Sequence, residues 1–147
     1  MRSLVVYDSN FGNTYKIAET IAGVLNAELK KVTEIQAEQL FGLNILIVGS
    51  PTNAWTMTRA TKSFIEGLDP RKLIGLTIAA FDTDMGKWYA GNAAKKIQKR
   101  LRALGFEPII QPEQFIVLGR EGPLKEGEIE RAKDWAMKIT TKFESTN

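Results

Sequence analysis

Short apolar runs alternate along the chain with longer segments in which apolar residues recur every three or four positions. The runs lie at residues 4–7, 43–48 and 73–81. A short run that is apolar at nearly every position is typical of a strand buried on both faces of a parallel sheet. We therefore predict that these three segments form the centre of a parallel sheet.

Four other segments are predicted to be helices. They are residues 15–25, 58–68, 94–104 and 129–143, where apolar side chains fall on one stripe that can pack against a sheet. Gly105 follows the third of them, at the position where glycine commonly ends a helix. Strands that alternate with helices in this way predict a doubly wound α/β sheet.

Two further segments predict the edges of the sheet. Residues 28–33 alternate polar and apolar side chains, which fits a partly exposed edge strand, and a short helical link leads from there to Phe41. Residues 109–118 contain Pro112, which has no N–H to donate to a neighbouring strand. We therefore expect the last strand to be interrupted or bent.

The ligand site of a doubly wound sheet lies at the carboxyl ends of its strands, beside the switch in strand order. The loops that begin at Asp8, Gly49 and Asp82 all fall at that edge. The first loop, residues 9–14, groups hydroxyl and amide side chains around Gly12, whose backbone can turn tightly. The next helix offers unpaired N–H groups, so this loop suits a phosphate. An ordinary helix-capping turn is the alternative interpretation of the loop by itself.

Composition limits the chemistry. The chain has 147 residues and is 44% hydrophobic, which predicts one domain over residues 1–147 with a substantial core. Cysteine and histidine are both absent, which excludes disulfides, thiol nucleophiles, histidine-based triads and the common zinc sites. Any chemistry must therefore use carboxylates, hydroxyls or a bound cofactor.

Charge and hydropathy add weaker expectations. No apolar run approaches the roughly 18 residues that a membrane helix needs, and no signal-like segment precedes the first strand, so we expect a cytoplasmic protein without membrane insertion. The net charge of +3 does not require a nucleic acid partner. A basic run on the third helix is expected to be a solvated face rather than a partner patch; it comprises Lys95, Lys96, Lys99, Arg100 and Arg102.

The first loop matches neither of two common phosphate motifs. The P-loop requires Gly-Lys-Ser/Thr, and the dinucleotide fingerprint requires three spaced glycines. The loop instead resembles the FMN phosphate loop of the flavodoxin family, Thr/Ser-x-Thr-Gly-x-Thr, at Ser9, Gly12, Asn13 and Thr14. Phe11 departs from that pattern and removes one hydroxyl donor.

The loops after the second and third central strands carry aromatic residues. Trp55 and the pair Trp88-Tyr89 resemble the two walls that clasp the flavin ring in flavodoxins, where a stacked ring contributes about 0.5–1.5 kcal/mol beyond its burial. The Gly-x-Pro-Thr sequence that begins at Gly49 also resembles this family. Trp135 lies beside the apolar stripe of the last helix and is predicted to be structural.

The resemblance covers essentially the whole chain. It implies a short-chain flavodoxin-like fold: three layers around a five-stranded parallel sheet of order 2-1-3-4-5. It also implies FMN as the cofactor, with the phosphate held by Ser9, Asn10, Phe11, Gly12, Asn13 and Thr14. The implied ring contacts are Pro51, Thr52, Asn53, Ala54, Trp55, Asp82, Thr83, Asp84, Gly86, Lys87, Trp88 and Tyr89.

Two departures from the family bear on redox behaviour. Flavodoxin carriers are usually acidic around the ring, whereas this chain is basic and is expected to place Lys87 near it. Thr56 follows Trp55 where many flavodoxins have a glycine. Because a nearby cation favours the anionic reduced flavin, we expect a less negative potential for full reduction than in acidic flavodoxins.

Three functional classes remain open. The first is a module that carries electrons for a redox partner protein. The second is an FMN-dependent reductase or oxidase of a quinone or porphyrinogen, and the third is a domain that has lost FMN and only binds a partner. The carrier comes first because no side chain is an evident acid or base for a substrate. A phosphoacceptor site at Asp8, Asp82 and Asp84 is excluded, since no Asp ends the second apolar strand and no Lys ends the last strand.

Overall fold

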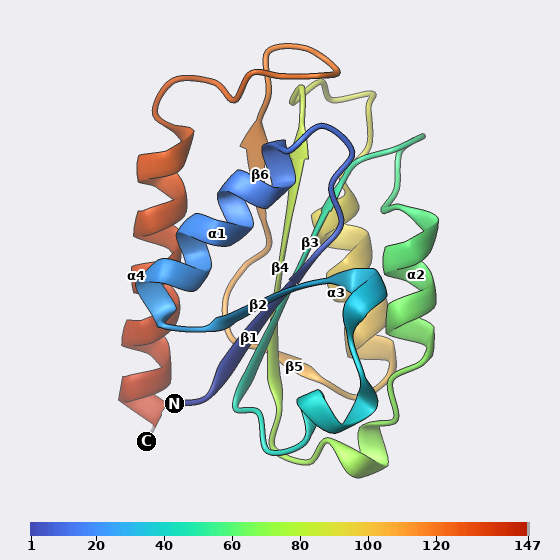
Figure 1. Cartoon of the computed structure of the whole chain (residues 1–147), viewed down its shortest axis with the longest axis vertical. Helices are drawn as coiled ribbons and strands as arrows, with labels where there is room; N and C mark the ends of the chain where they lie inside the picture. Colours follow the sequence, from blue (N-terminus) through green and yellow to red (C-terminus); the bar gives the residue numbers. More distant parts are fainter. Residues whose placement is uncertain (147) are drawn as a thin grey trace.

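Six strands form one parallel sheet in the computed structural model, which describes residues 1–146 (Figure 1). Their order is β2-β1-β3-β4, and β5 and β6 both pair with β4 at the far edge. This confirms the predicted α/β fold and its 2-1-3-4-5 order, with the fifth position divided between two short strands. Asn147, the last residue of the predicted domain, lies outside the described residues. The strands are β1 (Ser3–Tyr7), β2 (Glu28–Lys31), β3 (Ile45–Pro51), β4 (Thr77–Asp84), β5 (Glu107–Pro108) and β6 (Glu113–Ile116).

Helices cover both faces of the sheet and complete three layers. α1 and α4 lie side by side on one face, and α2 and α3 lie on the other (Figure 1). The link between β2 and β3 consists of two short 3-10 helices, as predicted. None of the helices in residues 1–146 combines the length and the hydropathy needed to cross a bilayer. The helices are α1 (Asn13–Leu25), η1 (Val32–Glu34), η2 (Ala37–Leu40), α2 (Arg59–Glu66), η3 (Pro70–Lys72), α3 (Ala93–Ala103) and α4 (Glu128–Thr146).

The two central strands β3 and β4 lie further along the chain than predicted. η3 and a turn at Gly75 (φ +79°) occupy the start of the expected third strand, so β4 begins only at Thr77. At the other end, β3 and β4 remain paired through Pro51↔Thr83. The predictions that loops begin at Gly49 and at Asp82 were therefore wrong, because Gly49 lies within β3 and Asp82 lies within β4.

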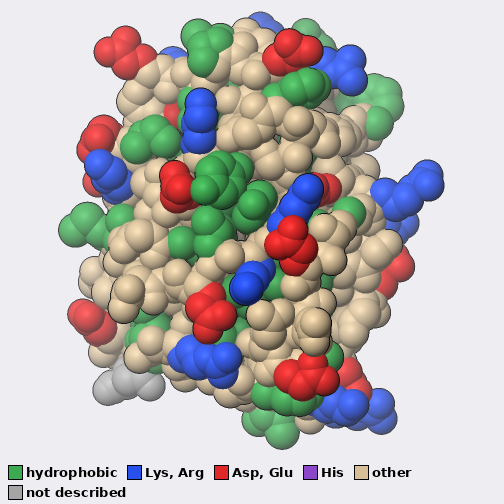
Figure 2. All heavy atoms as spheres, in the orientation of Figure 1, with side chains coloured by type: hydrophobic (Ala, Val, Ile, Leu, Met, Phe, Trp, Pro, Cys, Tyr) green, Lys and Arg blue, Asp and Glu red, His purple; other side chains and the backbone are tan. Residues whose placement is uncertain are grey.

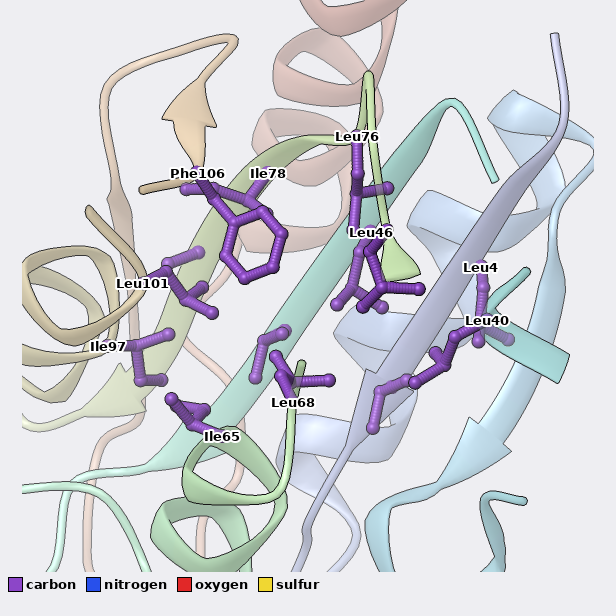
Figure 3. Packing of buried hydrophobic residues seen from close by; sticks show 14 of the residues in the cluster. Leu4, Leu40, Leu46, Ile65, Leu68, Leu76, Ile78, Ile97, Leu101 and Phe106 are labelled. Carbon is purple, nitrogen blue, oxygen red and sulfur yellow. The ribbon is translucent and has the colours of Figure 1, made fainter. Parts of the chain in front are cut away.

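Each face of the sheet has its own apolar cluster. On the α2 and α3 face, Ile65 and Leu101 pack toward Leu46 and Ile78 of the sheet, as Figure 3 shows from close by. On the α1 and α4 face, Trp135 packs edge-on against Phe81 and Phe115, at ring distances near 6 Å. Trp135 is therefore a core residue, as predicted. A buried sheet with apolar clusters on both faces gives the loops at its carboxyl end a rigid base.

The last edge of the sheet is interrupted where Pro112 predicted a break. β5 pairs with Thr77 and Ile78 of β4, whereas β6 pairs with the distant part of β4 that ends at Asp84. Between them, the Ile109 N–H still donates to the carbonyl of Ile78 at 2.9 Å. As a result, β6 delivers the segment that follows it to the same end of the sheet as the loops after β1, β3 and β4 (Figure 1).

Candidate functional site

A cavity of about 550 Å³ opens at the carboxyl ends of the strands, where the loops after β1, β3, β4 and β6 gather (Figure 1). Its volume is in the range of small-molecule sites. Eleven of the residues that the sequence selected line it: Ser9, Asn10, Phe11, Asn13, Thr14, Pro51, Thr52, Asn53, Ala54, Thr83 and Asp84. The selected residues outside this lining are Gly12, Trp55, Asp82, Gly86, Lys87, Trp88 and Tyr89.

The loop after β1 turns tightly into α1. Gly12 has φ +90° and stands at the N-cap position, and its N–H donates to the Ser9 hydroxyl at 3.0 Å. Among residues 1–146, no side chain caps α1, and the first turn of this helix has no acidic residue. The first N–H groups of a helix have no partner within the helix. This end of the cavity therefore offers backbone donors and the positive end of the helix dipole, which together suit an anion.

A buried hydroxyl pair joins this loop to β4. The hydroxyls of Thr14 and Thr83 lie 2.8 Å apart, and Thr14 is almost completely buried. On the other side, the Asn13 side chain donates to the Glu121 carbonyl at 3.2 Å. The first turn of α1 is therefore held from two directions, by β4 and by the loop that follows β6.

The loop after β3 makes a two-residue hairpin. Asn53 and Thr56 exchange both backbone hydrogen bonds, at 2.7 and 3.0 Å, across a turn formed by Ala54 (φ +46°) and Trp55 (φ +72°). Such a turn needs positive φ at both central residues, and glycine or asparagine usually occupies them. Backbone strain of this kind persists only where surrounding contacts impose it.

Those contacts come from the segment that leads to α3. The Trp55 indole N–H donates to the Tyr89 carbonyl at 2.7 Å, and the Lys96 ammonium donates to the Trp55 carbonyl, also at 2.7 Å. Gly91 (φ +88°) lies so close that a Cβ there would overlap the Trp55 backbone. The loops after β3 and β4 are thus fastened to each other at Trp55.

Trp55, Trp88 and Tyr89 do not line the cavity, whereas Phe11 does. Trp55 is 61% exposed and Trp88 is 94% exposed. Trp88 contacts Tyr89 edge-on with ring centroids 5.6 Å apart. Lys87 is exposed and lies outside the lining, so the geometry gives no support to the expectation that it controls a bound ring.

Asp82 is fully buried beneath the cavity. One of its carboxylate oxygens accepts hydrogen bonds from the Thr52 hydroxyl, the Ala94 N–H and the Gln114 amide, at 2.9–3.2 Å. Its other oxygen has no partner among the described residues. Burial raises the pKa of Asp82 from 3.8 to about 7, although the three donors oppose that rise. Asp82 therefore ties the loop after β3, α3 and β6 together. The sequence analysis expected it to contact the ring, but it does not line the cavity.

Three lining residues escaped the sequence analysis: Met85, Val117 and Arg120. Val117 and Arg120 follow β6 at the carboxyl edge of the sheet, the position that pointed to the other loops, so this loop could also have been predicted to contact a ligand. Arg120 is the one cation in the lining, within the described part of the chain, and Asp84 is the one carboxylate. Burial raises the pKa of Asp84, while hydrogen bonds from the N–H groups of Met85 and Gly86 oppose that rise.

Comparisons with known proteins identify the family. A family model described as a flavodoxin domain matches residues 4–115. The chain therefore belongs to the flavodoxin family. The flavodoxin of Aquifex aeolicus (strain VF5) is 35% identical to it over 113 residues, which cover 70% of this chain and 61% of that protein. The chain thus matches less than two thirds of that relative's length.

Solved structures agree with this fold. Oxidised flavodoxin 1 from Bacillus cereus has a TM-score of 0.81 at 18% identity, over 96% of this chain and 98% of that one. Oxidised flavodoxin 2 from Bacillus cereus has a TM-score of 0.78 at 25% identity, over 97% of this chain and 99% of that one. Both likenesses extend over nearly the full length of the chains compared.

Proposed function

We propose that this flavodoxin-family protein binds FMN in the cavity and carries electrons to or from a redox partner protein. The observation that carries the proposal is the uncapped N-terminus of α1, which opens on a cavity of about 550 Å³. A terminal phosphate satisfies the donors of such a helix end. Membership of the flavodoxin family supports the same cofactor.

The residues around the first loop fit a phosphate. Ser9 and Asn10 supply polar side chains, and the first turn of α1 supplies backbone N–H groups. Gly12 allows the chain to turn there with φ +90°, and within the described part of the chain no atom beyond its two neighbouring residues lies within 4 Å of where its Cβ would be. We assign the phosphate contacts to residues 9–14 because this segment combines a helix N-terminus, which favours anions, with a glycine that lets the backbone approach the phosphate closely.

The ring is assigned to the opposite half of the cavity. Residues 51–54 and 83–85 line that half, and Trp55, Trp88 and Tyr89 are exposed residues of the loops that continue from it. Aromatic side chains stack on flat heteroaromatic rings, so the exposed tryptophans are the proposed walls. When bound, FMN supplies the electron-carrying chemistry, and the chain supplies orientation and a partly dry environment.

Comparing FMN with riboflavin tests the assignment directly, because only FMN has the phosphate. Quenching of flavin fluorescence on titration with the protein gives both dissociation constants. One charge-assisted hydrogen bond to phosphate contributes roughly 1.5–3 kcal/mol, so FMN should bind at least about tenfold more tightly. Equal affinities would show that the first loop is only a capping turn. The absorption spectrum of the FMN-loaded protein would then report whether a redox-active complex forms.

A further inference from the structure

The basic face of α3 differs from the rest of the molecule in charge. The helix carries Lys95, Lys96, Lys99, Arg100 and Arg102 and contains no acidic residue. Because the whole chain has a net charge of +3 and this helix has +5, the remaining residues together have −2. Figure 2, in the orientation of Figure 1, views the molecule from the β2 edge, with α1 and α4 to the left and α2 and α3 to the right, and on this side Lys and Arg are interspersed with Asp and Glu. Positive charge is therefore concentrated on one helix.

This arrangement opposes formation of the helix itself. Lys95 and Lys99 stand four residues apart, as do Lys96 and Arg100, and like charges at that spacing repel. The helix dipole disfavours Lys95 and Lys96 in the first turn, whereas it favours Arg100 and Arg102 in the last turn. Arg100 meets the carboxylate of Glu66 at 3.8 Å, between side chains that are about half exposed. An anionic surface placed against α3 would relieve this repulsion.

The basic face adjoins the rim of the candidate flavin site. Lys96 donates to the Trp55 carbonyl, and the N–H of Ala93 donates to Thr52, which lines the cavity. Lys96, Lys99 and Arg100, together with Thr56, line a hollow of about 440 Å³ beside the Trp55 loop. A protein seated in this hollow would touch the loop proposed to hold one side of the ring.

The sequence alone led us to expect a solvated face here; from the structure we propose instead that the α3 face, defined by Lys95, Lys96, Lys99, Arg100 and Arg102, docks the acidic surface of an electron-transfer protein. The inference rests on the proposed function, because a docking site on α3 serves electron transfer only if the flavin ring lies next to it, as assigned above. Charge complementarity between the patches accelerates encounter and orients the partner. The charge of α3 favours acidic partners and rejects basic ones, which would meet like charge across the interface.

The charge-reversal variant Lys99→Glu/Arg100→Glu tests the surface. The matched control is Lys138→Glu/Lys142→Glu, which makes the same charge change four residues apart on exposed positions of α4. The probe is a fluorescently labelled two-iron, two-sulfur ferredoxin with an acidic surface, whose anisotropy reports binding. Neither pair lines the cavity, so FMN titration should give wild-type affinity in both variants.

We expect the α3 variant to weaken ferredoxin binding at least about tenfold at low salt, and the α4 variant to weaken it less than about twofold. Added salt should weaken wild-type binding and reduce the difference between the variants. Equal binding by the wild type and the α3 variant would overturn the proposal, provided circular dichroism shows the variant to be folded. Tighter binding of a basic cytochrome c than of ferredoxin would overturn it as well.

Two further binding experiments distinguish a protein partner from a nucleic acid or a membrane surface. A short DNA duplex and phosphatidylserine vesicles are tested with the same variants. If either binds through α3 while ferredoxin does not, the protein-docking proposal fails. The anisotropy measurement does not need flavin, so a protein that binds no FMN but binds ferredoxin through Lys99 and Arg100 would refute the proposed function and leave the docking surface standing.

Discussion

The two ends of the cavity are built in different ways. At the phosphate-loop end, Thr14 is 1% exposed and Asn13 is 7% exposed, and both are fixed by hydrogen bonds to other segments. At the aromatic end, Trp55 and Trp88 are largely exposed and a single indole hydrogen bond fastens the Trp55 side chain. The end suited to a charged group is preorganised, whereas the end suited to a flat ring depends on how two loops are held together.

The largest effect is expected on the pH dependence of folding stability, and it comes from the buried carboxylate of Asp82. Because the folded-state pKa of Asp82 is raised to about 7, the folded protein keeps a proton that the unfolded chain loses near pH 4. The free energy of unfolding should therefore decrease by up to about 4 kcal/mol between pH 4 and pH 8 from this group. Asp82→Asn should remove that decrease, as measured by urea unfolding across the pH range.

Asp134→Asn on the exposed face of α4 is the control for this titration and should keep the wild-type profile. If Asp82→Asn shows the same pH dependence as the wild type, Asp82 is not the titrating group. The titration of Asp82 bears on the aromatic end of the cavity, because one oxygen of Asp82 holds both Thr52 of the cavity wall and the start of α3. Loss of its proton changes the charge at the base of the aromatic end.

Substitutions at two glycines with nearly the same φ allow the folding stability of the two ends of the cavity to be compared. Gly12 has φ +90° and Gly91 has φ +88°, but only Gly91 has the Trp55 backbone where a Cβ would stand. Alanine at either position carries the backbone cost of roughly 1–2 kcal/mol. Gly91→Ala should lose about 1–3 kcal/mol more from overlap. Urea unfolding measures both, and equal losses would mean that the loops at Trp55 separate without cost.

The next effect concerns the exposed wall. Trp55→Ala should weaken FMN binding by about 1–3 kcal/mol, through lost stacking and lost apolar contact. Trp135→Ala is the contrast, because Trp135 is buried between Phe81 and Phe115 and its loss should lower folding stability. Fluorescence titration and urea unfolding of both variants separate the roles. Wild-type FMN affinity in Trp55→Ala would place the ring elsewhere.

The smallest effect is expected from Arg120, and it tests whether the phosphate end of the cavity needs a cation to bind FMN. Arg120 lines the cavity, so Arg120→Gln should weaken FMN binding by roughly 0.5–2 kcal/mol and riboflavin binding by less. Lys87→Gln removes an exposed charge outside the lining and should change either affinity less than Arg120→Gln does. Identical FMN titrations of Arg120→Gln and wild type would show that backbone donors alone hold the phosphate.

Much of the fold could be predicted because burial on both faces makes a strand apolar at every position. The runs that became β1, β3 and β4 carry that signal, and the proline break in the last strand does too. The exact ends of β3 and β4 could not be read from the sequence, since they depend on pairing between Pro51 and Thr83. That pairing moved Asp82 from the predicted loop into the sheet.

The candidate site divides in the same way. The first loop was identifiable because glycine and small polar residues directly precede a helix, which is a local pattern. The positions of Trp55 and Trp88 depend on contacts between two loops that are distant in sequence, in which Trp55 contacts Tyr89 and Gly91. A local sequence pattern cannot predict such a contact. Arg120 enters the cavity only because β6 carries its loop to the shared edge.

The interrupted edge formed by β5 and β6 also bears on how this protein behaves at high concentration. A long, regular edge strand presents a row of unpaired backbone groups on which another chain can add a strand. Here β5 and β6 are two and four residues long, with Pro112 between them. The opposite edge, β2, carries charged residues at three of its four positions: Glu28, Lys30 and Lys31. Both borders of the sheet therefore disfavour sheet extension and the aggregation that begins with it.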